Sequence, residues 1–220
     1  MLTSRGRWVV WLIIVAVLAL AVGPIFYLLP SAQDRFLAGL RQHARQLGFS
    51  MQLQRLAKLN PTAAERVSAS GQQRAPVVEC MRYQWLIREP IHAPLDIVLR
   101  RLPDSVTVSV QEAIAGWGVA KSGERRKTDH AGLHEIAQHP ELQHSLFECV
   151  RNLPDAVLAL GIEARSVSIY WHEEAAVPRS ADEKGRLADG KNLIEDLRGR
   201  LQTLALAIVQ TYGEHDNAPS

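Results

Sequence analysis

Residues 157–171, VLALGIEARSVSIYW, decide the fold class. The segments 157–160 and 166–171 are rich in β-branched and aromatic residues, which is typical of strands. The residues between them begin with Gly161, and glycine favours a turn. The stretch therefore predicts a β-hairpin, which is an antiparallel unit.

Further elements on both sides extend the sheet and cover it. Alternating or β-branched residues predict strands at 49–56, 77–87 and 105–110, and 97–102 fits a short strand or one helical turn. Helical spacing predicts a helix over 133–153 that is interrupted at Pro140, and connectors are expected at 59–75 and 173–190. One apolar stripe predicts a long terminal helix, and it consists of Ile194, Leu197, Leu201, Leu204 and Ile208. This order predicts an α+β fold with a mainly antiparallel sheet and helices packed on it.

The composition is that of a globular protein. Of the 220 residues, 47% are apolar and 22% are charged, and there are 2 cysteines. These values exclude a disordered chain, a collagen-like chain and a disulfide-dense mini-protein. Only one segment is long and apolar enough to span a membrane, which excludes a polytopic membrane protein.

That segment runs from Trp8 to Leu29 without a single charge. A helix of this length covers about 33 Å, enough for a hydrocarbon core of about 30 Å. Trp8, Trp11 and Tyr27 stand near its ends, where interfacial aromatic residues are common. We therefore expect a transmembrane helix over 8–29, after a short flank at 1–7.

A cleaved signal peptide is the alternative interpretation of the same segment. Arg5 and Arg7 form a charged start, and Ala19 and Ala21 fit a small-x-small cleavage site, which would release an exported domain. The apolar run continues to Leu29, and this length favours an uncleaved anchor.

Basic residues gather directly after the predicted span. Residues 31–74 carry seven basic and two acidic residues, whereas 75–220 carry 16 basic and 21 acidic ones. A helix is expected over 31–47, with Arg35, Arg41 and Arg45 as candidate contacts to anionic lipid headgroups. The simpler alternative is that this helix only covers the sheet. A nucleic-acid partner is not expected, because the large part of the chain is acidic.

These segments give the expected organisation of the whole chain. A soluble α+β domain is expected over 48–212, followed by a disordered tail over 213–220. The basic residues behind the span favour a cytoplasmic C-terminal domain. Cys80 and Cys149 fit either a reducing or an oxidising compartment, so their pairing stays open.

Histidines are the only candidate metal ligands with suggestive spacing. His130 and His134 are four residues apart and would share a helix face. The neighbouring sequence HEIAQH is one residue too long for a zincin motif. We therefore expect no metal site and keep His130 and His134 as weak candidate ligands. A membrane-tethered, metal-dependent hydrolase is accordingly an alternative function.

No cofactor is expected, and the remaining candidates are aromatic. The sequence from Gly116 to Ser122 resembles a phosphate loop but fails on its spacing, so a tight turn around a buried Trp117 is expected. Trp85, Tyr170 and Trp171 could line a binding surface, although such residues are more often part of a core.

The start of the chain resembles a family of membrane proteins. The segments IFYLLP, RFLAGLRQHARQLG and FSMQLQ are similar to the start of the YajC family, accessory subunits of the bacterial preprotein translocase, but the family's Gly-Asp strand signature is absent. More of the chain, through GIEARSVSIYWHEE, resembles uncharacterised single-pass proteins of gammaproteobacteria. This resemblance implies a bacterial inner-membrane protein with a cytoplasmic domain. We therefore expect a non-catalytic binding or accessory domain held near the membrane, with an unidentified membrane protein as a further partner.

Overall fold

A computed structural model describes residues 4–27, 30–89, 91, 95–120, 128–178 and 182–213. Side chains are described throughout these ranges except at 4–7, 21–27 and 128–130. The chain divides into two compact units, Met1–Phe36 and Leu37–Ser220.

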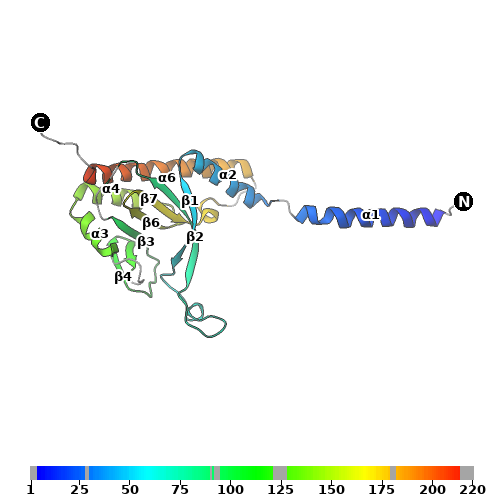
Figure 1. Cartoon of the computed structure of the whole chain (residues 1–220), viewed down its shortest axis with the longest axis horizontal. Helices are drawn as coiled ribbons and strands as arrows, with labels where there is room; N and C mark the ends of the chain where they lie inside the picture. Colours follow the sequence, from blue (N-terminus) through cyan, green and yellow to red (C-terminus); the bar gives the residue numbers. More distant parts are fainter. Residues whose placement is uncertain are drawn as a thin grey trace. The chain divides into compact units, whose positions relative to one another are not determined.

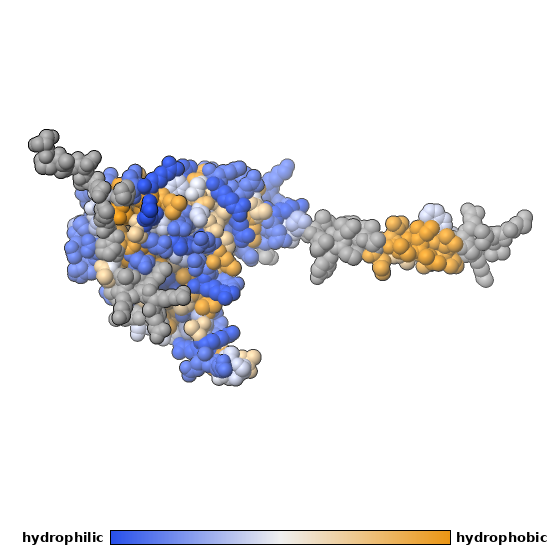
Figure 2. All heavy atoms as spheres, viewed as in Figure 1, coloured by the Kyte–Doolittle hydropathy of each residue, from blue (hydrophilic) through white to orange (hydrophobic). Residues whose placement is uncertain are grey.

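The first unit is dominated by helix α1, Ser4–Tyr27. The side chains of 8–20 are exposed all round this helix and form an almost continuous apolar surface (Figure 2). Among the described residues, no helix combines the length and the apolar character needed to cross a membrane. The predicted transmembrane helix over 8–29 is therefore not confirmed.

Helix α2, Ala32–Gln46, confirms the helix predicted over 31–47. Ser31 caps its start, because the Ser31 Oγ accepts the Asp34 N–H at 3.1 Å while the Ser31 N–H donates to the Asp34 carboxylate at 3.0 Å. Gly48 ends it with a φ of 96°, a conformation that glycine adopts without strain.

The second unit contains one antiparallel sheet of seven strands (Figure 1). Its order is β1-β2-β7-β6-β3-β5-β4. The strands are β1 Ser50–Ala57, β2 Val77–Leu86, β3 Asp96–Arg101, β4 Val110–Ile114, β5 Trp117–Ala120, β6 Val157–Glu163 and β7 Ser166–Trp171. The predicted α+β class and the hairpin at 157–171 are confirmed, but β6 continues to Glu163, so Gly161 lies in the strand and not in the turn.

Helices pack on one face of this sheet and enclose the main core. They are α3 Thr128–Ala137, α4 Pro140–Arg151 and α6 Glu183–Tyr212, whereas the short η1 Ala64–Arg66 and α5 Glu173–Ala176 lie in connections. Side chains alternate along a strand, so every second residue of the central strands enters this core. Its fully buried members include Leu99, Leu160, Ile162, Ile169 and Trp171 from the sheet, and the predicted stripe Ile194, Leu197, Leu201, Leu204 and Ile208 from α6.

The other face of the sheet holds a second, smaller cluster. It consists of the buried residues Cys80, Val98, Ala159 and Tyr170. The Arg100 Nη1 on β3 donates to the carbonyl oxygen of Ala57 on β1 at 3.1 Å, although β2, β7 and β6 lie between these strands in the sheet order. The sheet must therefore curve strongly, because only curvature brings β3 back to the end of β1.

The strand predicted at 105–110 is wrong. The structure places β4 at Val110–Ile114 instead, and both Val106 and Thr107 are exposed. The Thr107 N–H donates to the Leu59 carbonyl at 3.1 Å, so the segment lies along the loop that follows β1. The alternation of residue types at 105–110 predicted a strand with one buried face. The prediction is wrong because the sheet buries neither face of this segment.

The connector predicted over 173–190 is also wrong, because helices occupy much of it. Asp182 caps α6 by accepting the Lys184 N–H at 3.1 Å, and the helix begins at Glu183, well before the apolar stripe. The first turns carry the buried Arg186 and few apolar side chains. The spacing of apolar residues therefore gave no signal for these turns. Asp182, a residue type common at N-caps, was the signal available in the sequence. The predicted tail over 213–220 lies outside the described residues from 214 onward.

Gly132 allows α3 to approach β3 closely. A Cβ atom at this position would lie 2.7 Å from the Ile97 Cδ1 in the core. We expect Gly132→Ala to lower the free energy of unfolding by about 1–3 kcal/mol, because the buried Ile97 has to shift. Gly199→Ala is the matched control, since nothing lies within 4 Å of the added Cβ in α6, and alanine should there stabilise the helix by about 0.8–1 kcal/mol. Urea unfolding of both variants measures the difference, and equal effects would contradict the close approach.

Candidate functional site

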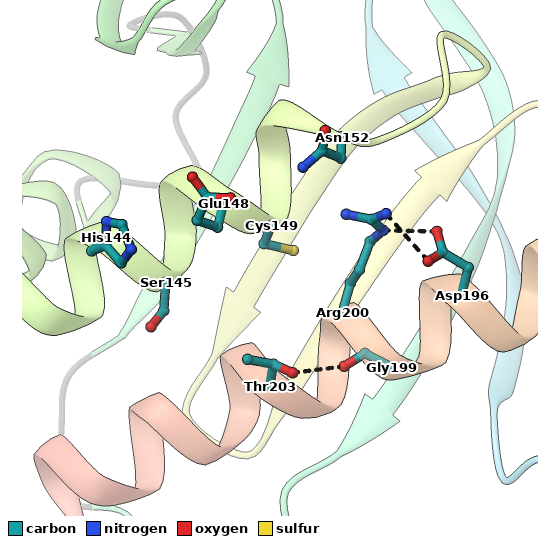
Figure 3. Close-up of a pocket in the computed structure, with 9 residues that line it drawn as sticks. All are labelled: His144, Ser145, Glu148, Cys149, Asn152, Asp196, Gly199, Arg200 and Thr203. Carbon is teal, nitrogen blue, oxygen red and sulfur yellow. Dashed lines mark hydrogen bonds and ion pairs between the residues drawn. The ribbon is translucent and has the colours of Figure 1, made fainter.

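A groove of about 490 Å³ lies between α4 and α6 (Figure 3). Pro140 occupies the first turn of α4, where its missing N–H costs no hydrogen bond. The buried Leu142 and Leu146 hold α4 in the core, and the groove is lined by other positions of the two helices. Polar side chains from both helices line it, among them His144 and Glu148 from α4, Asn152 directly after α4, and Asp196, Arg200 and Thr203 from α6.

The groove offers hydrogen-bonding groups but no activated nucleophile. The Cys149 thiol points from α4 toward α6 (Figure 3), and burial raises its pKa to about 12. The neighbouring Arg200 opposes this shift, yet it is held by Asp196 through bonds of 2.7 and 3.2 Å. A thiol with this pKa is protonated at neutral pH and unreactive. The groove is therefore suited to binding a polar group and not to thiol catalysis.

A buried carboxylate connects three parts of the second unit. Glu173 in α5 is 3% exposed and accepts two bonds from the Arg41 Nε, at 3.1 and 3.0 Å, and one from the Arg41 Nη2. The Tyr83 hydroxyl of β2 donates to the same carboxylate at 2.5 Å. Burial and the neighbouring Glu173 raise the pKa of Tyr83, which keeps this hydroxyl protonated. The bonds to Glu173 likewise raise the pKa of Arg41.

The three candidate headgroup contacts differ in their surroundings. Arg35 and Arg45 are exposed on α2. Arg41 is half-buried and bound to Glu173, so its guanidinium serves the packing of α2. Headgroup binding by Arg35 and Arg45 stays a prediction.

The three aromatic candidates do not form one surface. Trp171 is fully buried in the main core and packs edge-on against Tyr83 at 5.2 Å. Tyr170 points to the second face and is 3% exposed. Trp85 is half-buried and lines a shallow cavity of about 320 Å³ together with the exposed Leu86 and Leu206. Only Trp85 lies where a partner could reach it.

Of the two histidine candidates, the structure describes the side chain of His134 alone. His134 is exposed on α3, and its Nδ1 lies 3.0 Å from the Gln138 side chain. The His130 side chain lies outside the described residues. Within the described parts of the chain, no group of three His, Cys, Asp or Glu side chains is placed to hold a metal ion.

Two buried arginines on the second face were missed by the sequence reasoning. Arg82, Tyr170, Ala159 and Arg100 stand opposite one another in one row across β2, β7, β6 and β3. Arg82 pairs with Glu163 at 2.6 Å, and burial lowers the pKa of Arg100. A charged residue at an inward position of a predicted strand was the available signal. Arg100 donates a hydrogen bond to the carbonyl oxygen at the end of β1, and this bond stabilises the curvature of the sheet.

Comparisons with protein-family models, with curated proteins and with solved structures give no match for this chain. The resemblance of the N-terminal part to the YajC family therefore stays a prediction.

Removing Arg41 should destabilise the second unit, whereas removing Arg45 should not. Arg41→Ala leaves the buried Glu173 carboxylate without its cation, and we expect a loss of about 2–3 kcal/mol in the free energy of unfolding. Arg45→Ala is the control on the same helix, with an expected change within about 0.5 kcal/mol because Arg45 is exposed. Urea titration of both variants checks this, and equal midpoints would show that the buried pair contributes little.

Both buried thiols should make the protein less stable in alkali. Burial raises the pKa of Cys80 to about 11 and that of Cys149 to about 12, against 9.0 for an unperturbed thiol. Between pH 9 and 11 the unfolded chain loses these protons and the folded chain keeps them, so stability falls as pH rises, by up to about 1.4 kcal/mol per pH unit and thiol. Replacing both cysteines by alanine should flatten the dependence of the urea midpoint on pH. An unchanged slope in that variant would contradict the assignment.

Proposed function

We propose that this chain is a single-pass protein of the bacterial inner membrane whose α+β domain acts by binding and not by catalysis. The observation that carries the proposal is the exposure of the apolar side chains of 8–20 all round α1. A helix that is apolar on every side is normally buried in a protein or in a bilayer. The charge-free sequence from Trp8 to Leu29 extends beyond these side chains to the length of a hydrocarbon core.

The basic helix α2 supports a position of the domain near anionic lipid. Arg35 and Arg45 are exposed on it, and each well-placed basic residue contributes about 1 kcal/mol to binding an anionic surface. Arg41 has a different role, because within the second unit its bond to Glu173 joins α2 to α5. The basic residues behind the span favour a cytoplasmic domain.

The groove between α4 and α6 supports a binding function. Its volume is within the range of ligand sites in proteins, and its lining offers both donors and acceptors. Cys149 is protonated there, so the groove offers no activated thiol, which favours binding over thiol-based catalysis. A metal-dependent hydrolase using His130 and His134 stays the alternative function.

Membrane fractionation tests the anchor. The full chain should stay in the membrane fraction through alkaline carbonate washing, whereas a variant lacking residues 1–30 should be released, because it has lost the apolar segment. Sequencing the N-terminus of the mature chain is the control for processing. A start at Val22, or release of the full chain by carbonate, would show that the segment is not an anchor.

Vesicle binding tests the basic helix in the variant lacking residues 1–30. Arg35→Glu with Arg45→Glu should lower its co-sedimentation with vesicles containing phosphatidylglycerol, by about tenfold or more. Arg151→Glu with Arg165→Glu is the matched control, because it makes the same change in charge at two exposed positions outside α2. Equal binding by the double variant and the control would contradict the role of α2.

A further inference from the structure

Strand β1 is an outer strand of the sheet and has little of the usual protection of such strands. It has eight residues, SMQLQRLA, without proline or lysine, and within the described chain it pairs only with β2. The opposite outer strand, β4, has five residues, an irregularity between Glu112 and Ile114, and an acidic side chain. Short strands, bulges and charges prevent edge-to-edge association. β4 therefore has all three protective features, whereas β1 has only the charge of Arg55.

The hydrogen-bond pattern shows which backbone groups of β1 face away from the sheet. The Lys58 N–H donates to the Pro76 carbonyl at 2.9 Å, directly after the strand pair. In an antiparallel ladder such bonded positions recur at every second residue, so the even-numbered residues of β1 bond β2. The N–H and C=O groups of Met51, Leu53 and Arg55 consequently point outward.

Side chains along β1 make the middle of this edge apolar. Leu53 is 63% exposed, at the centre of the outward-facing backbone groups. It lies on the same face of the sheet as Tyr83, its diagonal neighbour on β2, yet no element of the described chain covers it. In β-strand addition, a second strand pairs with the outward-facing backbone groups of an outer strand, and exposed side chains such as Leu53 add specificity.

The sequence of β1 fits a second copy of itself. In an antiparallel pair centred on Leu53, each Leu53 faces the other, Arg55 faces Met51 of the second copy, and Gln54 faces Gln52. No like charges are opposed, and Arg55 keeps its bond to Glu79 at 2.9 Å on the inner side. A parallel pair in register would place the two Arg55 side chains together, which is unfavourable.

We propose that β1 is a homodimer interface, in which two chains join their sheets through antiparallel β1 strands centred on Leu53. The contact is the same on both copies, as a two-fold axis requires. The proposal does not depend on the membrane anchor, because it rests on the second unit alone.

Disulfide cross-linking tests the strand register in the full chain, purified in detergent. In the proposed pair the two Leu53 Cα atoms are about 5.5 Å apart, within reach of a disulfide. The two Gln54 Cα atoms would be about 8 Å apart, which is too far. After mild oxidation, Leu53→Cys should give about tenfold more covalent dimer than Gln54→Cys. The native Cys80 and Cys149 are buried and free, so they should not compete.

A second measurement separates this interface from association elsewhere. Leu53→Pro removes one outward N–H and leaves the bonds to β2 in place, so the variant should fold and associate at least about tenfold more weakly in sedimentation. Leu53→Lys should act in the same direction by adding like charges at the centre. Circular dichroism confirms folding of both variants. A monomeric wild-type chain, equal cross-linking at positions 53 and 54, or unchanged association of both folded variants would overturn the proposal.

Discussion

The buried carboxylate of Glu173 is the constraint on which the arrangement of the second unit depends. A carboxylate that is 3% exposed requires a cation and hydrogen-bond donors, and Arg41 and Tyr83 supply them from α2 and β2. One charge thus fixes the helix, the sheet and the connection after β7 to one another. The sequence predicted Arg41 as a lipid contact, but its bond to Glu173 gives it a structural role. It holds α2 in place, and Arg45 is exposed on the same helix.

The sheet separates two interiors of different character. The helix-covered face is almost entirely apolar, and Trp171 and Tyr83 form its aromatic centre. The other face holds Arg82 and Arg100 beside Tyr170, and strong curvature closes it. Small residues permit this closure, since a Cβ at Gly161 would lie 2.7 Å from the Ser168 Oγ. Hydrophobic packing therefore dominates the helix-covered face, where Glu173 and Arg41 form a buried ion pair, and arginines with their hydrogen-bond partners dominate the other face.

Local signals predicted those parts of the fold whose stability is local. The helix over 31–47 and the hairpin at 157–171 were predicted correctly, because neighbouring residues make their contacts, as the Ser31 cap of α2 shows. The strand expected at 105–110 failed because its backbone partner, Leu59, is distant in the sequence. For the candidate sites the limit was similar. Helical spacing indicated α4 and α6 but not the groove between them, and the link between Arg41 and Glu173 spans 132 positions.

The turn at Gly48 also determines how mechanical load enters the domain. Only Leu47, Gly48 and Phe49 separate α2 from β1, and Phe49 is buried against Tyr83. There is no slack between the helix and the outer strand of the sheet. A force applied to α2 would act first on the ion pair between Arg41 and Glu173. It would then act on the hydrogen bonds between β1 and β2, beginning with the pair nearest to Phe49. Hydrogen bonds loaded in this way break one pair after another. The segment from α2 to β1 would therefore detach from β2 progressively, while the central strands stay folded.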